Sequence, residues 1–279
     1  MTTITEQIKN IGIVPVVKLD DAKDAIPLAK ALIEGGLPCA EVTFRTDAAY
    51  ESIRLIAETY PEMLVGAGTV LTTEQVDASI EAGAKFIVSP GLNPKIVKYC
   101  IEKNIPIFPG CANASDIEQA IECGLEVVKF FPAEVNGGLD AINALSGPYP
   151  NMKFMPTGGV NLKNMMRYLS SDKIIACGGT WMVSDALIKS GNYDEIVRIS
   201  QEAVNQMIDL RLDGMESSND AVLSILDIER TSHYVVSTTH LSRAMYNLAS
   251  KGYEFTTPKM ESGHMSSEIV GKNIKLIER

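Results

Sequence analysis

The chain has 279 residues, of which 46% are hydrophobic, and a formal net charge of -10 at pH 7. This length is enough for one large α/β domain with a small appendage. The acidic balance argues against nucleic acid or an anionic membrane as a partner, because both attract a basic surface. We therefore predict an ordinary globular protein that binds neither.

Cysteine usage and the first segment of the chain favour a reducing compartment. The opening residues, MTTITEQIKNIGIVPVV, lack the basic start and long apolar stretch of a secretory signal, and no later run approaches membrane-spanning length. None of the five cysteines has CxxC spacing, and several lie in or beside apolar runs. We therefore expect buried, reduced thiols and a cytoplasmic location.

Short apolar runs alternate with amphipathic segments through most of the chain. Strands are predicted at 11–17, 40–44, 64–66, 86–88, 106–108, 127–131, 153–155 and 174–176. Helical patterns lie between them, and glycine follows several of these, as is common just after a helix end. Eight β/α steps in about 215 residues predict an α/β fold, a (β/α)8 TIM barrel. A doubly wound open sheet is the alternative, but no GxGxxG motif follows the first strand.

The end of the chain has a different pattern. The barrel is predicted to span residues 1–212 and to close with a helix over 192–211, and the small polar segment 213–220 is typical of a linker. Residues 221–279 predict a small α+β appendage of the βαββ type, with strands at 233–237, 253–257 and 273–278. A unit of about 60 residues is only marginally stable by itself, so we expect it to pair with another chain.

Histidine is confined to this tail, where His233, His240 and His264 lie. Its absence from the predicted barrel excludes Ser-His and Cys-His catalysis there, and also an imidazole-bound zinc site. Carboxylates, lysines and tyrosines remain as the groups available for acid–base chemistry in the barrel.

Two of the predicted strands carry charged residues toward the barrel interior. In AEVTFR, the polar Glu41, Thr43 and Arg45 share one face, because alternate side chains of a barrel strand point inward. In EVVKFFP, Lys129 lies among apolar residues near the C-terminal end of its strand, where barrel active sites form. Lys129 could balance Glu41 or Glu134 in a buried ion pair, or it could be a Schiff-base nucleophile with Glu41 moving protons. Apolar surroundings and a nearby cation favour the neutral, nucleophilic form of a lysine.

Glycine pairs follow the last two predicted barrel strands. MPTGGV places Gly158 and Gly159 after the seventh strand, and ACGGTW places Gly178, Gly179 and Thr180 after the eighth. Backbone N–H groups and a hydroxyl in these loops often hold phosphate in barrels of this kind. The glycines could instead only make tight turns, but two pairs at successive strands favour phosphate binding.

Two further loops contribute small polar residues to the same rim. GAGTV follows the third predicted strand and contains Thr69, and SPG follows the fourth and contains Ser89 and Gly91. A hydroxyl at this rim could hold a carboxylate. Turn formation explains Ser89 nearly as well.

The ordered set EVTFRT, GAGTV, SPG, PIFPG, KFFPAE, PTGG and GGTW resembles the 2-keto-3-deoxy-6-phosphogluconate (KDPG) and 4-hydroxy-2-oxoglutarate (KHG) aldolase family, from about Ile11 to about Val204. The resemblance implies a (β/α)8 barrel, usually a homotrimer, that acts on a small-molecule keto acid without a metal or cofactor. It implies that Lys129 is the Schiff-base lysine and Glu41 the proton-transfer carboxylate.

The resemblance also implies the residues that bind substrate. Arg45 and Thr69 would hold the pyruvyl carboxylate, Phe131 would line the pocket, and Gly158, Gly159 and Thr180 would take the phosphate. The implied substrate-binding set is completed by Pro90, Thr157 and Gly179. Thr180 stands where serine is common in the family. Asn113 stands where threonine is frequent, and this second difference would alter the preferred aldehyde.

The implied reaction is cleavage of KDPG to pyruvate and glyceraldehyde 3-phosphate, of KHG to pyruvate and glyoxylate, or of both. A related 2-keto-3-deoxy sugar acid, such as the 6-phosphogalactonate epimer, is the alternative substrate. Two different functions compete with aldol cleavage. One is a barrel enzyme that uses Lys129 only as a charge, and the other is a non-catalytic barrel that binds a sugar phosphate.

The tail faintly resembles half of a glyoxalase-like (vicinal oxygen chelate) domain. In such domains the positions of His233 and Glu278 can bind a metal ion. We favour a pairing module without metal, because a half domain cannot bury its own sheet face.

Overall fold

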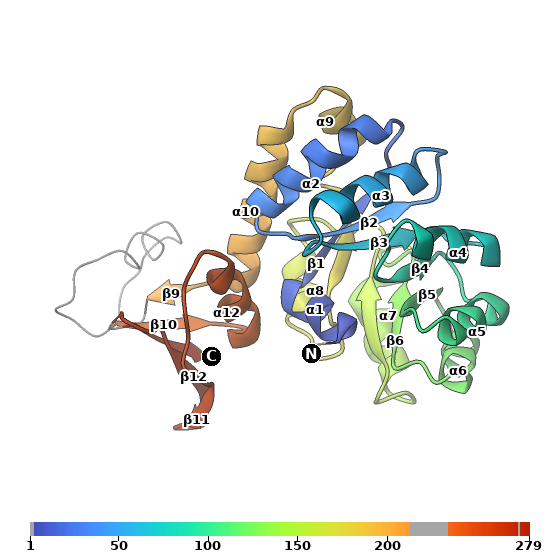
Figure 1. The fold of residues 1–279 in the computed structure, drawn as a ribbon. Helices are drawn as coiled ribbons and strands as arrows, with labels where there is room; N and C mark the ends of the chain where they lie inside the picture. Colours follow the sequence, from blue (N-terminus) through green and yellow to red (C-terminus); the bar gives the residue numbers. More distant parts are fainter. Residues whose placement is uncertain (1–2, 213–233, 273) are drawn as a thin grey trace. The chain divides into compact units, whose positions relative to one another are not determined.

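The computed structural model describes residues 3–212, 234–272 and 274–279. The chain divides into two compact units, Met1–Ser200 and Gln201–Arg279. Each unit has its own sheet, and Figure 1 follows both along the chain. None of the described helices is both long and apolar enough to cross a lipid bilayer.

The first unit contains a barrel of eight parallel strands in the order β7-β6-β5-β4-β3-β2-β1-β8. The strands are β1 (Ile13–Val17), β2 (Cys39–Thr43), β3 (Leu64–Gly68), β4 (Ile87–Ser89), β5 (Ile107–Cys111), β6 (Val127–Phe130), β7 (Lys153–Pro156) and β8 (Cys177–Gly179). Parallel bridges Phe154↔Ile174 and Thr157↔Gly178 join the two ends of this sheet. The predicted (β/α)8 barrel is therefore confirmed.

Helices lie before β1, between the strands and after β8. They are α1 (Ile4–Ile11), α2 (Ala25–Glu34, after the short 3-10 helix η1, Ala22–Asp24), α3 (Ala49–Thr59), α4 (Thr73–Glu81), α5 (Pro94–Glu102), α6 (Ala114–Glu122), α7 (Gly138–Ser146), α8 (Met165–Leu169), α9 (Asp185–Lys189) and α10 (Tyr193–Ile208). Helix α1 was not predicted from the sequence, although Thr3 and Glu6 form a capping box at its start and signal a helix there.

Side-chain caps fix where several of these helices begin. The side chains of Thr72, Asn93 and Ser184 accept hydrogen bonds from backbone N–H groups in the first turns of α4, α5 and α9. Strands β1 to β5 are buried along their whole length, because helices cover one face and the barrel core fills the other. The C-terminal ends of the barrel strands are held in a fixed arrangement by this packing.

The described residues of the second unit contain a five-stranded sheet in the order β11-β12-β13-β10-β9. Its elements are β9 (Arg211–Leu212), β10 (Tyr234–Thr238), α12 (Leu241–Ser250), β11 (Lys259–Glu261), β12 (His264–Glu268) and β13 (Ile274–Glu278). Strands β10 and β13 are parallel, and the other neighbours are antiparallel. Val236 and Leu276 lie opposite each other in β10 and β13, and both are fully buried. Ala244 and Leu248 of α12 are also fully buried.

The described part of the appendage differs from the predicted βαββ unit in one hairpin. The predicted strand at 253–257 is reduced to an isolated bridge between Phe255 and Ile269, and the hairpin β11–β12 lies further along the chain. Ser262 and Gly263 turn this hairpin with φ values of 51° and 86°, both in the left-handed region. Strand β9 pairs with β10, although residues 211–212 fall in the predicted barrel range. The predicted linker, 213–220, lies outside the described residues.

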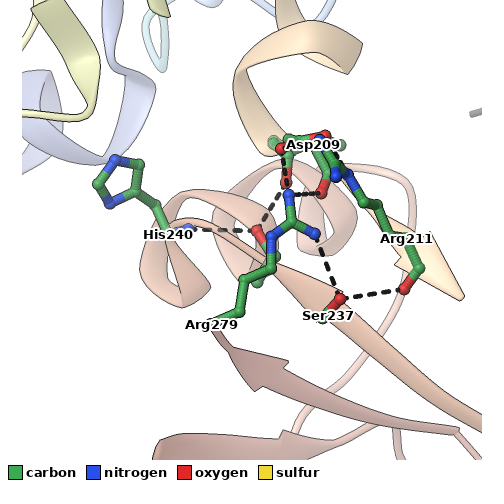
Figure 2. Close-up of polar contacts among 7 residues, drawn as sticks. Asp209, Arg211, Ser237, His240 and Arg279 are labelled. Carbon is green, nitrogen blue, oxygen red and sulfur yellow. Dashed lines mark hydrogen bonds and ion pairs between the residues drawn. The ribbon is translucent and has the colours of Figure 1, made fainter. Parts of the chain in front are cut away.

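A polar network explains why the end of α10 belongs to the second unit (Figure 2). The Asp209 carboxylate pairs with Arg279, and Arg211 Nε lies 3.2 Å from its other oxygen. Arg279 also donates to Ser237 Oγ at 3.3 Å, and the Thr238 hydroxyl donates to the backbone oxygen of Ile208 at 2.6 Å. These contacts join the end of α10 and the residues after it to β10 and to Arg279, which directly follows β13.

Candidate active site

A cavity of about 310 Å³ lies at the C-terminal ends of the barrel strands. It is lined by Val16, Glu41, Arg45, Thr69, Pro90, Lys129, Phe131, Thr157, Gly158, Gly159, Val160, Gly179 and Thr180. The structure thus brings together the two predicted catalytic residues and the whole substrate-binding set that the resemblance implied. Val16 and Val160 are the additional members. Val16 lies near the C-terminal end of β1, and Val160 directly follows the PTGG loop. These sequence positions could have identified both residues as part of the lining.

Lys129 lies on β6 and is 5% exposed. In the barrel it is aligned with Gly110 of β5 and Met155 of β7. Its Nζ lies 3.3 Å from Oε1 of Glu41 and 4.9 Å from the centroid of the Phe131 ring. A lysine in this setting is held between one carboxylate and apolar or aromatic surfaces, with little access to bulk water.

Glu41 lies on β2 and is 1% exposed. Its Oε1 accepts the hydrogen bond from Lys129, whereas Oε2 is buried with no hydrogen-bond partner among the described residues. A buried carboxylate oxygen without a partner is costly, so it marks a place where a ligand group or water binds. Gly68 makes room for this side chain, because a Cβ at residue 68 would be 2.3 Å from Glu41 Oε1.

The backbone of Thr69 is unusual for a β-branched residue. Its φ is 58°, in the left-handed region that such residues rarely adopt. Strain of this kind is concentrated at functional sites, where the surrounding structure enforces it. Thr69 lines the cavity together with the exposed Arg45, which follows β2 and supplies a positive charge at the cavity mouth.

The loop after β7 contributes backbone and a hydroxyl to the other side of the cavity. Gly158 and Gly159 have φ values of 96° and 82°, so they adopt a turn that other residues disfavour. The Thr157 hydroxyl is buried without a partner in the described part of the chain. Gly178 does not line the cavity. Its role is to leave space for Thr157, whose Oγ1 would be 2.3 Å from a Cβ at residue 178.

Three further residues singled out in the sequence, Ser89, Gly91 and Asn113, also lie outside the cavity lining. The Ser89 hydroxyl donates to the backbone oxygen of Gly91 at 2.8 Å, which supports the turn interpretation. Asn113 is the N-cap of α6, and its Oδ1 accepts from Asp116 N–H at 3.1 Å. The expectation that Asn113 alters the preferred aldehyde therefore has no support from its position.

No group of three or more His, Cys, Asp or Glu residues suited to a metal ion occurs within the described ranges. His233 lies outside these ranges. The Glu278 carboxylate accepts the backbone N–H of Leu241 at 3.2 Å, at the start of α12. Glu278 therefore stabilises the N-terminus of a helix, where a negative charge is favourable.

The barrel unit matches a known family model. The model for KDPG and KHG aldolase matches residues 4–199. The chain belongs to the KDPG and KHG aldolase family. A 2-dehydro-3-deoxy-phosphogluconate aldolase from Haemophilus influenzae is 50% identical over 202 residues, which are 72% of this chain and 95% of that protein.

Solved structures of aldolases share the fold. The KDPG aldolase of Legionella pneumophila, crystallised with pyruvate captured as a covalent carbinolamine intermediate, has a TM-score of 0.70 and 36% identity, over 72% of this chain and 98% of that one. The KDPG aldolase of Zymomonas mobilis, crystallised with 3-phosphoglycerate, has a TM-score of 0.67 and 36% identity, over 72% of this chain and 94% of that one.

Proposed function

We propose that this aldolase-family chain is a class I aldolase, a lyase that forms a Schiff base through Lys129. It cleaves KDPG to pyruvate and glyceraldehyde 3-phosphate, KHG to pyruvate and glyoxylate, or both. The observation that carries the proposal is the buried pair of Lys129 and Glu41, 3.3 Å apart, in a cavity at the C-terminal ends of the barrel strands. Membership of the family supports the same chemistry.

The reaction begins with the neutral amine of Lys129. Glu41 is close enough to accept the ammonium proton, which leaves a lone pair on Nζ. The amine attacks the C2 ketone of the substrate and gives a carbinolamine. Protonation and loss of the C2 hydroxyl as water then give an iminium ion, which draws electrons toward C2.

Cleavage requires a base at the C4 hydroxyl. Glu41, directly or through a water molecule, takes this proton while the C3–C4 bond breaks and the aldehyde forms. The electrons of that bond move to the iminium and make an enamine. Protonation at C3 and hydrolysis of the imine release pyruvate and restore the amine of Lys129. The Oε2 atom of Glu41, which has no hydrogen-bond partner in the described part of the chain, is suited to this second role.

The ends of the substrate would occupy different parts of the cavity. Arg45 and the Thr69 hydroxyl bind the carboxylate at C1, and Phe131 and Pro90 line the pocket around the carbon chain. The phosphate of KDPG binds to Thr157, Gly158 and Gly159 after β7, to Gly179 at the end of β8 and to Thr180 directly after it. Positive φ values at Gly158 and Gly159 support this assignment, because such turns form anion-binding concavities.

Substrate preference is the part of the proposal that needs direct measurement. Steady-state rates of pyruvate release from KDPG, from its 6-phosphogalactonate epimer and from KHG, each with and without EDTA, test the reaction and rank the substrates. Release from KDPG or KHG that EDTA leaves unchanged supports the proposal. Release from none of them favours a non-catalytic sugar-phosphate barrel, and strong EDTA inhibition favours a metal-dependent aldolase.

Assembly and location are further parts of the proposal. The barrel forms a homotrimer, as the family resemblance implies, and the appendage pairs with another chain. Within the described residues the cysteines are free thiols, four of them buried, which supports a reducing cytoplasm. Native mass spectrometry of the full chain tests the assembly.

A further inference from the structure

The segment after β6 runs beside the loop after β7. Ala133 N–H donates to the backbone oxygen of Thr157 at 2.8 Å, and Glu134 N–H donates to that of Gly158 at 3.1 Å. The strand that carries Lys129 is therefore connected by backbone hydrogen bonds to the loop assigned to phosphate. A shift of either segment changes the position of the other.

The side chain of Glu134 lies directly against Gly159. A Cβ at residue 159 would be 2.6 Å from Cγ and 2.7 Å from Cβ of Glu134, so only glycine fits at this contact. On the other side, Asn161 and Asn164 each donate a side-chain N–H to the backbone oxygen of Gly159, at 3.0 and 3.1 Å. The Gly158–Gly159 turn is thus held from two directions.

Tyr168 fixes the carboxylate of Glu134. Tyr168 lies on α8 and is 1% exposed, and its hydroxyl donates to Oε1 of Glu134, which is itself an exposed residue. Burial, and then the hydrogen bond to Glu134, raise the pKa of Tyr168. The hydroxyl therefore stays protonated at neutral pH and remains a donor. Neither side chain lines the cavity.

We propose that Glu134 and Tyr168 are positioning residues that hold the Gly158–Gly159 turn in the shape that binds the substrate phosphate. This inference rests on the function proposed above and extends it to specificity. KDPG has a phosphate at the far end of a six-carbon chain, whereas KHG is shorter and ends in a carboxylate next to C4. Glu134 and Tyr168 should therefore strengthen the binding of KDPG and affect the binding of KHG much less.

Replacing Tyr168 with phenylalanine tests the inference. Tyr168→Phe removes the hydroxyl and leaves the ring, so the Glu134 side chain is free to turn away from Gly159. We expect KM for KDPG to rise about fivefold, the usual effect of losing one positioned hydrogen bond, with kcat changed less than about twofold. KM for KHG and the rate of pyruvate trapping on Lys129 should stay at wild-type values.

The matched control is Tyr149→Phe. Tyr149 donates to Glu118 at 2.9 Å in the same kind of tyrosine–glutamate pair, and neither residue lines the cavity. This control should leave KM unchanged for both substrates. A Tyr168→Phe protein whose KM rises equally for KDPG and KHG, or for neither, would overturn the inference.

Variants of Glu134 separate positioning from charge. Glu134→Gln keeps a carbonyl oxygen for the Tyr168 hydroxyl and the same side-chain path along Gly159, so KM for KDPG should remain within about twofold of wild type. Glu134→Ala removes the carbonyl oxygen and the side chain that packs on Gly159, so it should raise KM for KDPG as Tyr168→Phe does. Equal losses in the Gln and Ala variants would contradict a role through the hydrogen bond. Failure of the wild-type protein to form a pyruvate adduct would instead refute the proposed function itself.

Discussion

At the scale of single residues, the site depends on one buried lysine and its carboxylate partner. The sequence placed Glu41 on the inward face of its strand by alternation and Lys129 near the end of an apolar strand. The sequence left either Glu41 or Glu134 as the carboxylate partner of Lys129, and the fold selects Glu41, whose Oε1 lies 3.3 Å from the lysine Nζ. The contact between Tyr168 and Glu134 could only be seen in the fold, because no local pattern links α8 to the loop after β6.

Replacing Glu41 tests the proton transfer. Glu41→Gln keeps the size of the side chain but cannot accept a proton, so kcat for KDPG or KHG should fall by about 100-fold or more. The control is Glu118→Gln, at an exposed carboxylate whose residue does not line the cavity. Steady-state measurement of pyruvate release gives the comparison. A Glu41→Gln protein within a few-fold of wild type would show that another group is the base.

Thiol reactivity follows from burial of the cysteines. Burial raises the pKa of Cys100 and, with a smaller contribution from Asp116, that of Cys111, in each case to about 12. Burial, with a smaller contribution from Glu41, also raises the pKa of Cys39. Raised values keep these thiols protonated and unreactive near pH 8.

Reaction with Ellman's reagent checks this expectation. In the native protein, Cys123 should react first, because it is partly exposed while the other four cysteines are buried. All five should react in denaturant. Rapid native reaction of Cys100 or Cys111 would contradict the packing around these thiols.

At the scale of elements, the barrel could be predicted because short, largely apolar strands alternate with amphipathic helices at a regular interval. The β11–β12 hairpin could not be recognised by that rule, because KMESGHMSSE is largely polar. The Ser-Gly turn within it was the remaining signal. The function of Gly178 was also misjudged, since a glycine next to a cavity can make room for a neighbour without touching ligand.

Gly68 of β3 gives a test at this scale. Gly68→Ala would place a Cβ 2.3 Å from Oε1 and 2.6 Å from Cγ of Glu41, so the Glu41 side chain must leave its position beside Lys129 Nζ or the strand must shift. We expect kcat to fall by about tenfold or more, because a displaced Glu41 carboxylate is no longer positioned to transfer protons to and from the substrate. The control is Gly91→Ala in the nearby SPG loop, where an added Cβ meets nothing within 4 Å. Equal activity of the two variants would argue against the placement of Glu41.

At the scale of the whole molecule, the chain combines a barrel with a second, smaller unit. The residues that line the cavity all lie in the first unit, Met1–Ser200. The family model ends at residue 199, and the alignment to the Haemophilus influenzae relative covers 95% of that protein, so a barrel of this length makes up nearly all of a related aldolase. The appendage is therefore expected to affect assembly and not the chemistry.

Truncation after Ser217 separates the two contributions. We expect the shortened chain to keep kcat/KM within about twofold of the full chain, because no cavity residue is removed. If the appendage pairs with another chain, native mass spectrometry should show fewer chains per assembly after truncation. The same number of chains in both proteins would contradict the pairing role of the appendage.

The role of Lys129 as the Schiff-base nucleophile is tested most directly by finding the residue to which pyruvate becomes covalently attached. The full-length protein is incubated with pyruvate and borohydride, digested and analysed by peptide mass spectrometry, beside a Lys129→Met variant. We predict a reduced pyruvate adduct on Lys129 in the wild-type protein, and neither adduct nor cleavage in the variant. An adduct on a different lysine, or cleavage at the original rate in a correctly assembled Lys129→Met protein, would contradict this prediction.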